Sequence, residues 1–101
     1  MYKPIYMRKK LFNFPCIYGF THPKHGVVYV GRTSAFSAAI KRTRSAIRHP
    51  DKYNGNFHLK VLEMGLCDKL QPVVFEICDG MTKKEMIRLK NMYILALNPM
   101  L

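Results

Sequence analysis

Residues 16–31 read CIYGFTHPKHGVVYVG, and this segment decides which fold the chain is expected to adopt. Residues 16–20 form a short apolar run, and residues 27–31 are rich in β-branched and aromatic side chains, so each run is typical of a β-strand. The six residues between them contain Pro23 and Gly26, which favour a turn. So short a link predicts that the two strands pair as an antiparallel hairpin.

The rest of the domain is predicted from capping residues and apolar patterning. Thr33 or Ser34 is a suitable cap for a helix after the hairpin, Gly65 for the end of a second helix, and Thr82 for the start of a third. The elements predicted after the hairpin are a helix to about His49, a helix over about 56–64, a strand over 72–78 and a helix to about Leu97. The order β-β-α-α-β-α predicts a small α/β domain with a three-stranded mixed or antiparallel sheet flanked by helices. The helical link between the second and third strands favours a crossover.

Composition is that of one globular domain, since 49% of the 101 residues are hydrophobic and 23% are charged. We expect a basic, aromatic-rich N-terminal arm at 1–15 and the α/β domain at 16–101. No apolar run approaches the ~18 residues of a membrane span, and the N-terminus lacks the apolar core of a secretory signal. Three scattered cysteines favour a reducing interior. The expected location is therefore the cytoplasm, and the host cytoplasm if the protein is viral.

Charge points to a polyanionic partner. Seventeen Lys and Arg residues stand against six Asp and Glu, which gives a formal net charge of +11. Because such an excess costs self-repulsion, we favour nucleic acid, DNA before RNA, over a basic surface kept for solubility. The expected phosphate contacts are Lys41, Arg44 and Arg48 along one face of the first predicted helix, and Arg8, Lys9 and Lys10 of the arm. The aromatic residues that could stack on unpaired bases, or equally pack in the core, are Tyr2, Tyr6, Phe12, Phe14 and Tyr53.

Two tripeptides in the hairpin resemble those of a known family. Cys16-Ile17-Tyr18 in the first strand and Tyr29-Val30-Gly31 in the second resemble the paired motifs of the GIY-YIG nucleases, with a cysteine in place of the first glycine. The likeness continues through the GRTSAF segment at 31–36, Gly65, and the YILALNP segment at 93–99. It therefore covers residues 16–99 and implies a GIY-YIG-like arrangement of the predicted elements.

The resemblance implies a nuclease site that this sequence retains only in part. Members of this family resemble one another in cutting phosphodiester bonds. They use one divalent metal held by a glutamate, a tyrosine that takes part in the nucleophilic attack, and an arginine on the first helix. Tyr18 and Tyr29 are retained, but Ala39 occupies the position of the arginine, eight residues after Gly31, and Lys90 occupies that of the glutamate. The resemblance thus implies a catalytically degenerate member of the fold, without a metal or other cofactor.

Neighbouring residues offer only a partial replacement. Arg42 lies three residues after Ala39, about 60° round the helix, so it is able to reach the same cleft. Glu85 is rotated about 140° from Lys90, onto another face of the last helix. Lys90 falls within an apolar stripe, which favours either a phosphate contact or a stem that extends to the surface. The cations expected to line a basic cleft are Arg32, Arg42 and Lys90.

Three functions stay open on the sequence alone. The first is non-catalytic nucleic-acid binding on a degenerate GIY-YIG scaffold, through the basic cleft and the first helix. The second is a small viral or mobile-element inhibitor or regulator that binds a host nucleic-acid-processing protein. Its contact surface, or a homodimer interface, would use apolar residues outside the main stripe of the last helix, namely Ile87, Met92 and Leu95. The third is an active Mg²⁺-dependent endonuclease with relocated catalytic residues.

Overall fold

The structure, a computed structural model, describes residues 13–48, 63, 65 and 69–100, and its first two strands form the hairpin expected from residues 16–31. The described elements are the strands β1 (Cys16–His22), β2 (Gly26–Thr33) and β3 (Gln71–Ile77) and the helices α1 (Phe36–Arg48) and α3 (Lys83–Leu97). All five were expected, with bounds that differ by one or two residues at most ends. The helix expected over 56–64 lies outside the described residues apart from Glu63, and Gly65, its expected cap, has a φ of 66°.

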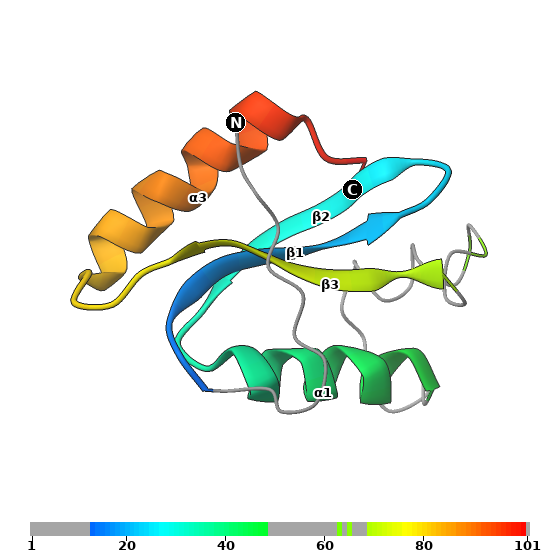
Figure 1. Cartoon of the computed structure of the whole chain (residues 1–101), viewed down its shortest axis with the longest axis horizontal. Helices are drawn as coiled ribbons and strands as arrows, with labels where there is room; N and C mark the ends of the chain where they lie inside the picture. Colours follow the sequence, from blue (N-terminus) through cyan, green and yellow to red (C-terminus); the bar gives the residue numbers. More distant parts are fainter. Residues whose placement is uncertain (1–12, 49–62, 64, 66–68, 101) are drawn as a thin grey trace.

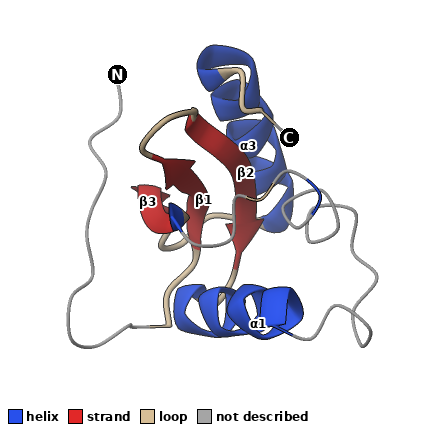
Figure 2. Ribbon diagram, turned by 90° about the vertical axis from the view of Figure 1, so that its right-hand side faces the viewer, coloured by secondary structure: helices blue, strands red, loops and turns tan. Residues whose placement is uncertain are grey.

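The sheet is antiparallel and has the strand order β2-β1-β3. Because β3 returns beside β1 and not beside β2, the link between β2 and β3 crosses the sheet, as predicted. Three layers result, in which α1 covers one face of the sheet and α3 covers the other (Figure 1 and Figure 2). Neither α1 nor α3, the helices of the described segments, is long and apolar enough to cross a membrane.

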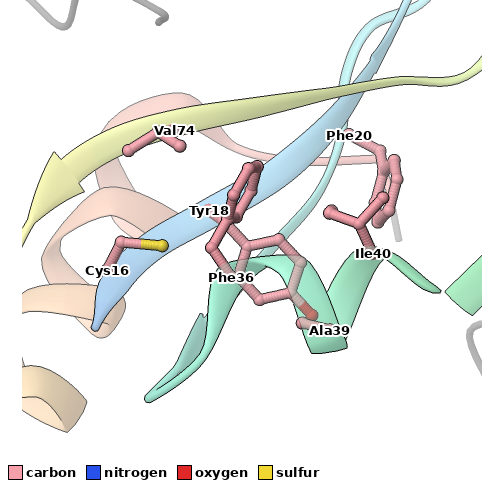
Figure 3. Close-up of a cluster of buried hydrophobic side chains, with 7 residues drawn as sticks. All are labelled: Cys16, Tyr18, Phe20, Phe36, Ala39, Ile40 and Val74. Atoms are coloured by element: carbon pink, nitrogen blue, oxygen red, sulfur yellow. The ribbon is translucent and has the colours of Figure 1, made fainter. Parts of the chain in front are cut away.

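Side chains alternate between the two faces of the sheet and form two separate cores. On the α1 face, Tyr18, Phe20 and Val74 pack against Phe36 and Ile40 of α1 (Figure 3). The core on the α3 face consists of Ile17, Val30, Val73, Phe75, Cys78 and Met86. Phe36, Ile40 and Thr43 fall on one stripe of α1, and all three are buried.

A bulge in β3 fixes the position of α3. The register between β1 and β3 shifts after Ile17, which leaves Phe75 as the extra residue. Phe75 and Glu76 therefore both reach Tyr93 of α3. The Phe75 ring stacks on the Tyr93 ring with centroids 5.7 Å apart, and Tyr93 Oη donates a 2.7 Å hydrogen bond to Glu76 Oε1. One helix side chain thus binds two consecutive residues of the strand.

The start of α1 differs from the predicted one. Thr33 or Ser34 was expected to cap the helix, but the helix begins after Ala35, and Thr33 Oγ1 instead accepts a 3.0 Å hydrogen bond from the Ala35 amide. In the first turn, the Ala38 amide donates to Asn13 Oδ1 over 3.2 Å. The prediction is wrong because a side chain 25 residues upstream supplies the acceptor that a local cap would provide.

Residues 13–15, which the sequence assigned to the arm, are joined to the domain. The Phe14 carbonyl accepts a 3.2 Å hydrogen bond from the Phe36 amide, and the Pro15 carbonyl accepts one of 2.8 Å from Cys78. The Phe14 ring stacks on the Phe36 ring at a centroid distance of 5.4 Å. The folded domain therefore starts at least three residues before the predicted boundary at Cys16.

Thr82 caps α3 as predicted. Its hydroxyl accepts a 3.2 Å hydrogen bond from the Glu85 amide, and the Glu85 carboxylate accepts one of 2.8 Å from the Thr82 amide. These reciprocal bonds form a capping box, which satisfies two free donors at the start of the helix. The helix ends at Asn98, whose left-handed backbone lets its amide bond to the Ile94 carbonyl over 2.9 Å.

Gly19, in the middle of β1, should tolerate no side chain. A Cβ there would overlap the carbonyl oxygen of Tyr29 in β2 and lie 2.8 Å from Cε2 of Phe75. Since the paired backbone cannot retreat without breaking the strand ladder, Gly19→Ala should lower the free energy of unfolding by about 3 kcal/mol or more. Urea unfolding followed by circular dichroism measures the loss.

Gly80→Ala is the control for this experiment. Gly80 has a φ of 77° but no atom within 4 Å of an added Cβ, so its substitution should cost only the left-handed strain of about 1 to 2 kcal/mol. Equal losses in the two variants would contradict the close approach of β2 and β3 at Gly19.

Candidate functional site

Tyr18 and Tyr29, the two tyrosines retained from the resemblance, lie side by side on the α1 face of the sheet. Their ring centroids are 6.1 Å apart, and the ring planes meet at 62°. Tyr18 pairs with Gly31 across the hairpin, and a Cβ on Gly31 would lie 2.7 Å from Tyr29 Oη. The Tyr29 ring therefore extends along β2 over bare glycine backbone, and its hydroxyl forms a hydrogen bond with that of Tyr18.

The phenol of Tyr18 is a neutral group at physiological pH. Its side chain is 7% exposed, and this burial raises its pKa above the ordinary value of about 10. The hydrogen bond to Tyr29 and the charge that Tyr29 would carry as a phenolate raise the pKa further, whereas Arg42 lowers it to a smaller extent. Tyr18 is thus suited to hydrogen bonding and poorly suited to act as a phenolate base.

Ala39 packs below Tyr18 at the place where the resemblance would put an arginine. The two side chains belong to one buried cluster, and the Tyr18 hydroxyl, which holds the single oxygen drawn in Figure 3, points toward Ala39. Arg42 lies three residues further along α1, is exposed, and acts on Tyr18 through its positive charge. The structure therefore brings together Tyr18, Tyr29 and Arg42, with Ala39 beneath them.

The exposed face of α1 is positively charged. Lys41, Arg42 and Arg44 are all exposed, and none of the 13 residues of the helix is acidic. Arg48 belongs to the same helix, but its side chain lies outside the described residues. Without a carboxylate on the helix to offset them, these cations produce a positive potential along one side of the domain.

The other two cations expected in the cleft lie toward the opposite face. Arg32 pairs with Ile17 across the hairpin, and Ile17 belongs to the core on the α3 face, so the Arg32 side chain shares that face. Lys90 is a half-buried residue of α3, which covers the same face. Arg32, Arg42 and Lys90 are thus divided between the two faces of the sheet.

The divalent metal that the resemblance implies has no matching ligands here. Lys90, at the position of the glutamate, carries a positive charge that repels a cation. Glu85, the nearest acid along α3, is engaged in the capping box with Thr82. Among the residues that the structure describes, no group of three His, Cys, Asp or Glu side chains could hold a metal ion. The described residues therefore do not fit the metal of the family.

Several residues expected to bind nucleic acid are not placed by the structure. Those outside the described residues are Arg8, Lys9 and Lys10 of the arm and the aromatic residues Tyr2, Tyr6, Phe12 and Tyr53. Phe14 is described, and it is half-buried against Phe36. Phe14 therefore contributes to packing at the start of α1 and not to stacking on bases.

The outer side of α3 exposes apolar side chains. Leu95 is 84% exposed and Met92 is 59% exposed, whereas Ile87 is half-buried. A shallow apolar hollow beside Met92 is also lined by Leu89, Tyr93, Ala96 and Glu76. Met92 and Leu95 thus lie outside the buried stripe of the helix, as the sequence predicts.

Sequence reasoning did not single out four side chains at the hairpin tip. His22, Lys24 and His25 were assigned only to turn chemistry, and Lys69 to no site at all. The HPKH pattern at 22–25 was visible in the sequence. The approach of Lys69 depends on the pairing of β3 with β1, which no local pattern indicates.

Comparison of the chain with protein-family models, with curated protein sequences and with solved structures found no match.

Gly31→Ala should displace Tyr29 without unfolding the sheet. An added Cβ would lie 2.7 Å from Tyr29 Oη and 2.8 Å from its Cε2, and both atoms belong to a half-buried side chain that is able to rotate outward. We expect a stability loss of about 1 to 2 kcal/mol, smaller than that of Gly19→Ala. In NMR spectra, the ring resonances of Tyr18 and Tyr29 should shift while the amide resonances of β3 stay in place. Unchanged tyrosine rings would contradict the contact between Tyr29 and Gly31.

Proposed function

We propose that this protein binds nucleic acid without cleaving it. The observation that carries the proposal is the row of exposed cations on α1, Lys41, Arg42 and Arg44, on a helix that has no acidic residue. Phosphate groups bind such a row with release of counterions, and the resulting affinity depends on salt more than on base sequence. The half-buried Tyr29 adds a hydroxyl that is hydrogen-bonded to Tyr18, the residue on which Arg42 acts, and a tyrosine hydroxyl suits hydrogen bonding to a phosphate oxygen.

The same site lacks the groups that phosphodiester cleavage needs. Cleavage requires an activated nucleophile and a charge that stabilises the transition state. Ala39 and Lys90 stand where the resemblance expects the arginine and the metal-binding glutamate. Burial raises the pKa of Tyr18, so the phenol keeps its proton and is not available to accept one from a nucleophile. We therefore propose a GIY-YIG-like scaffold that binds nucleic acid and does not cleave phosphodiester bonds.

Salt dependence tests the role of α1. Lys41→Gln combined with Arg44→Gln should weaken binding to a labelled DNA duplex and reduce the slope of log affinity against log salt by about 0.9 for each lost phosphate contact. Gel shifts or fluorescence anisotropy over a salt series give the slope.

The matched control is the pair Lys83→Gln and Lys84→Gln, which removes two exposed cations from the start of α3. This pair should leave the slope near that of the parent protein. Affinity that ignores salt, or that falls equally in both double variants, would argue against α1 as the binding surface.

Incubation with plasmid DNA tests the absence of cleavage. In the presence of Mg²⁺ or Mn²⁺, we expect supercoiled plasmid to stay intact at protein concentrations that bind it fully, because the described residues supply no metal site. Tyr18→Phe serves as the control for contamination by another nuclease. Robust nicking by the parent protein that disappears in Tyr18→Phe would show that the tyrosine pair is catalytic and would overturn the proposal.

A regulator that binds a protein is the second candidate, favoured by the exposed Met92 and Leu95. The net charge of +11 disfavours a second copy of the chain as the occupant of this surface. The partner that fits is an acidic amphipathic helix, whose apolar face would cover Leu95 and whose carboxylates would face Arg88 one to two turns earlier. This candidate becomes the preferred one if the purified protein binds neither duplex nor single-stranded nucleic acid.

A further inference from the structure

Four side chains that carry or accept protons meet at the tip of the β1–β2 hairpin. His22 ends β1, Lys24 and His25 lie in the turn, and Lys69 precedes β3. The rings of His22 and His25 have centroids 4.8 Å apart. Lys69 is brought to this end of the sheet because β3 begins at Gln71, which pairs with β1 one residue before His22.

His22 is held in a defined orientation within this cluster. The Lys24 amide donates a 3.0 Å hydrogen bond to Nδ1 of His22, so the neutral ring carries its proton on Nε2. The pKa of His22 is lowered by desolvation and then by electrostatic interaction with His25, Lys69 and Lys24. All three of these neighbours are cationic or accept a proton. An anion is therefore the group whose arrival would favour the protonated form of His22.

We propose that the hairpin tip is a second contact site for the phosphodiester backbone, and that it binds more tightly when His22 is protonated. This inference rests on the proposed function, because it extends the binding surface of α1 to a part of the fold that the GIY-YIG resemblance gives no role. Lys24 and Lys69 supply positive charge at the tip, and His22 supplies a charge that depends on pH.

The hairpin tip and the end of α1 lie toward the same end of the molecule (Figure 1). The start of α1 is joined to Phe14, just before β1, and both β1 and α1 run from there toward the end of the molecule that carries the hairpin tip (Figure 1). With 13 residues, α1 is about 20 Å long. α1 lies on one side of the sheet, and the hairpin tip lies at the level of α3 (Figure 1 and Figure 2), so a nucleic acid that contacts both sites spans this end of the sheet.

Binding measured against pH tests the inference. A labelled DNA duplex is titrated at fixed salt, between about pH 5.5 and about pH 8, with the parent protein and with His22→Gln combined with His25→Gln. The parent should bind more tightly at the lower pH, about tenfold for each histidine whose pKa rises by one unit on binding. The double variant should match the parent at the higher pH and lose most of the gain at the lower one.

The possible results distinguish a failure of the hairpin-tip site from a failure of the proposed function. Parallel pH profiles for parent and double variant would overturn the hairpin-tip site and leave the proposed function standing. A parent protein that binds no duplex or single strand at any pH or salt concentration would overturn the proposed function itself. Lys24→Gln combined with Lys69→Gln should reduce the salt slope, in contrast to the control pair at Lys83 and Lys84.

NMR of the parent protein keeps the test independent of variant folding. The imidazole C–H resonances of His22 report its pKa with and without the DNA duplex. That pKa should rise when the duplex binds, because phosphate favours the charged ring. A pKa of His22 that stays fixed while the amide resonances of α1 shift would place the nucleic acid on α1 alone and overturn the inference.

Discussion

The bare backbone of Gly19 is the constraint on which the rest of the structure depends. At this point of β1, the carbonyl of Tyr29 and the ring of Phe75 occupy the space that any side chain would need. On one side, the Phe75 ring is thereby free to stack on Tyr93 and hold α3 against the sheet. On the other side, β2 lies close enough to β1 for Tyr29 to reach Tyr18. A single glycine thus leaves the room that the Phe75–Tyr93 contact and the close approach of β2 both need.

The three-layer arrangement separates the chemistry of the two faces. The α1 face carries the tyrosine pair and an acid-free row of cations, whereas Glu76 and Glu85 lie on the β3 and α3 side. Both of these carboxylates are engaged in hydrogen bonds with their own side of the fold. The positive charges of α1 are therefore not offset by acids of their own helix.

Local patterns in the sequence were enough to predict most of the described elements. The strand pair at 16–31, the crossover to β3 and the Thr82 cap all follow from side chains within a few residues of the feature they determine. The Asn13 bond to α1 and the approach of Lys69 to His22 could not be predicted in this way. Both depend on partners that are far apart in the chain and meet only through sheet pairing.

The candidate site could also be predicted from local sequence patterns only in part. Helix periodicity placed Arg42 near the cleft, and the structure puts its charge within reach of Tyr18. Arg32 and Lys90 lie on the opposite face of the sheet from Arg42, and this depends on strand register and on which face each helix covers. Neither of these can be read from residue types along the chain, because a shift of one residue in register reverses the face of every side chain in a strand.

The small side chain at position 39 and the raised pKa of Tyr18 belong to one arrangement of packing. An alanine at position 39 allows α1 to pack directly against Tyr18, and the phenol is left only 7% exposed. Burial then raises the pKa of Tyr18, so the packing that holds α1 against the sheet also keeps the proton on this phenol. Arg42 has the opposite effect on the pKa of Tyr18, but this effect is smaller than that of burial, and the Arg42 side chain is exposed on α1. Tyr18 is thus a buried, hydrogen-bonded phenol that lies beside the exposed cations of α1.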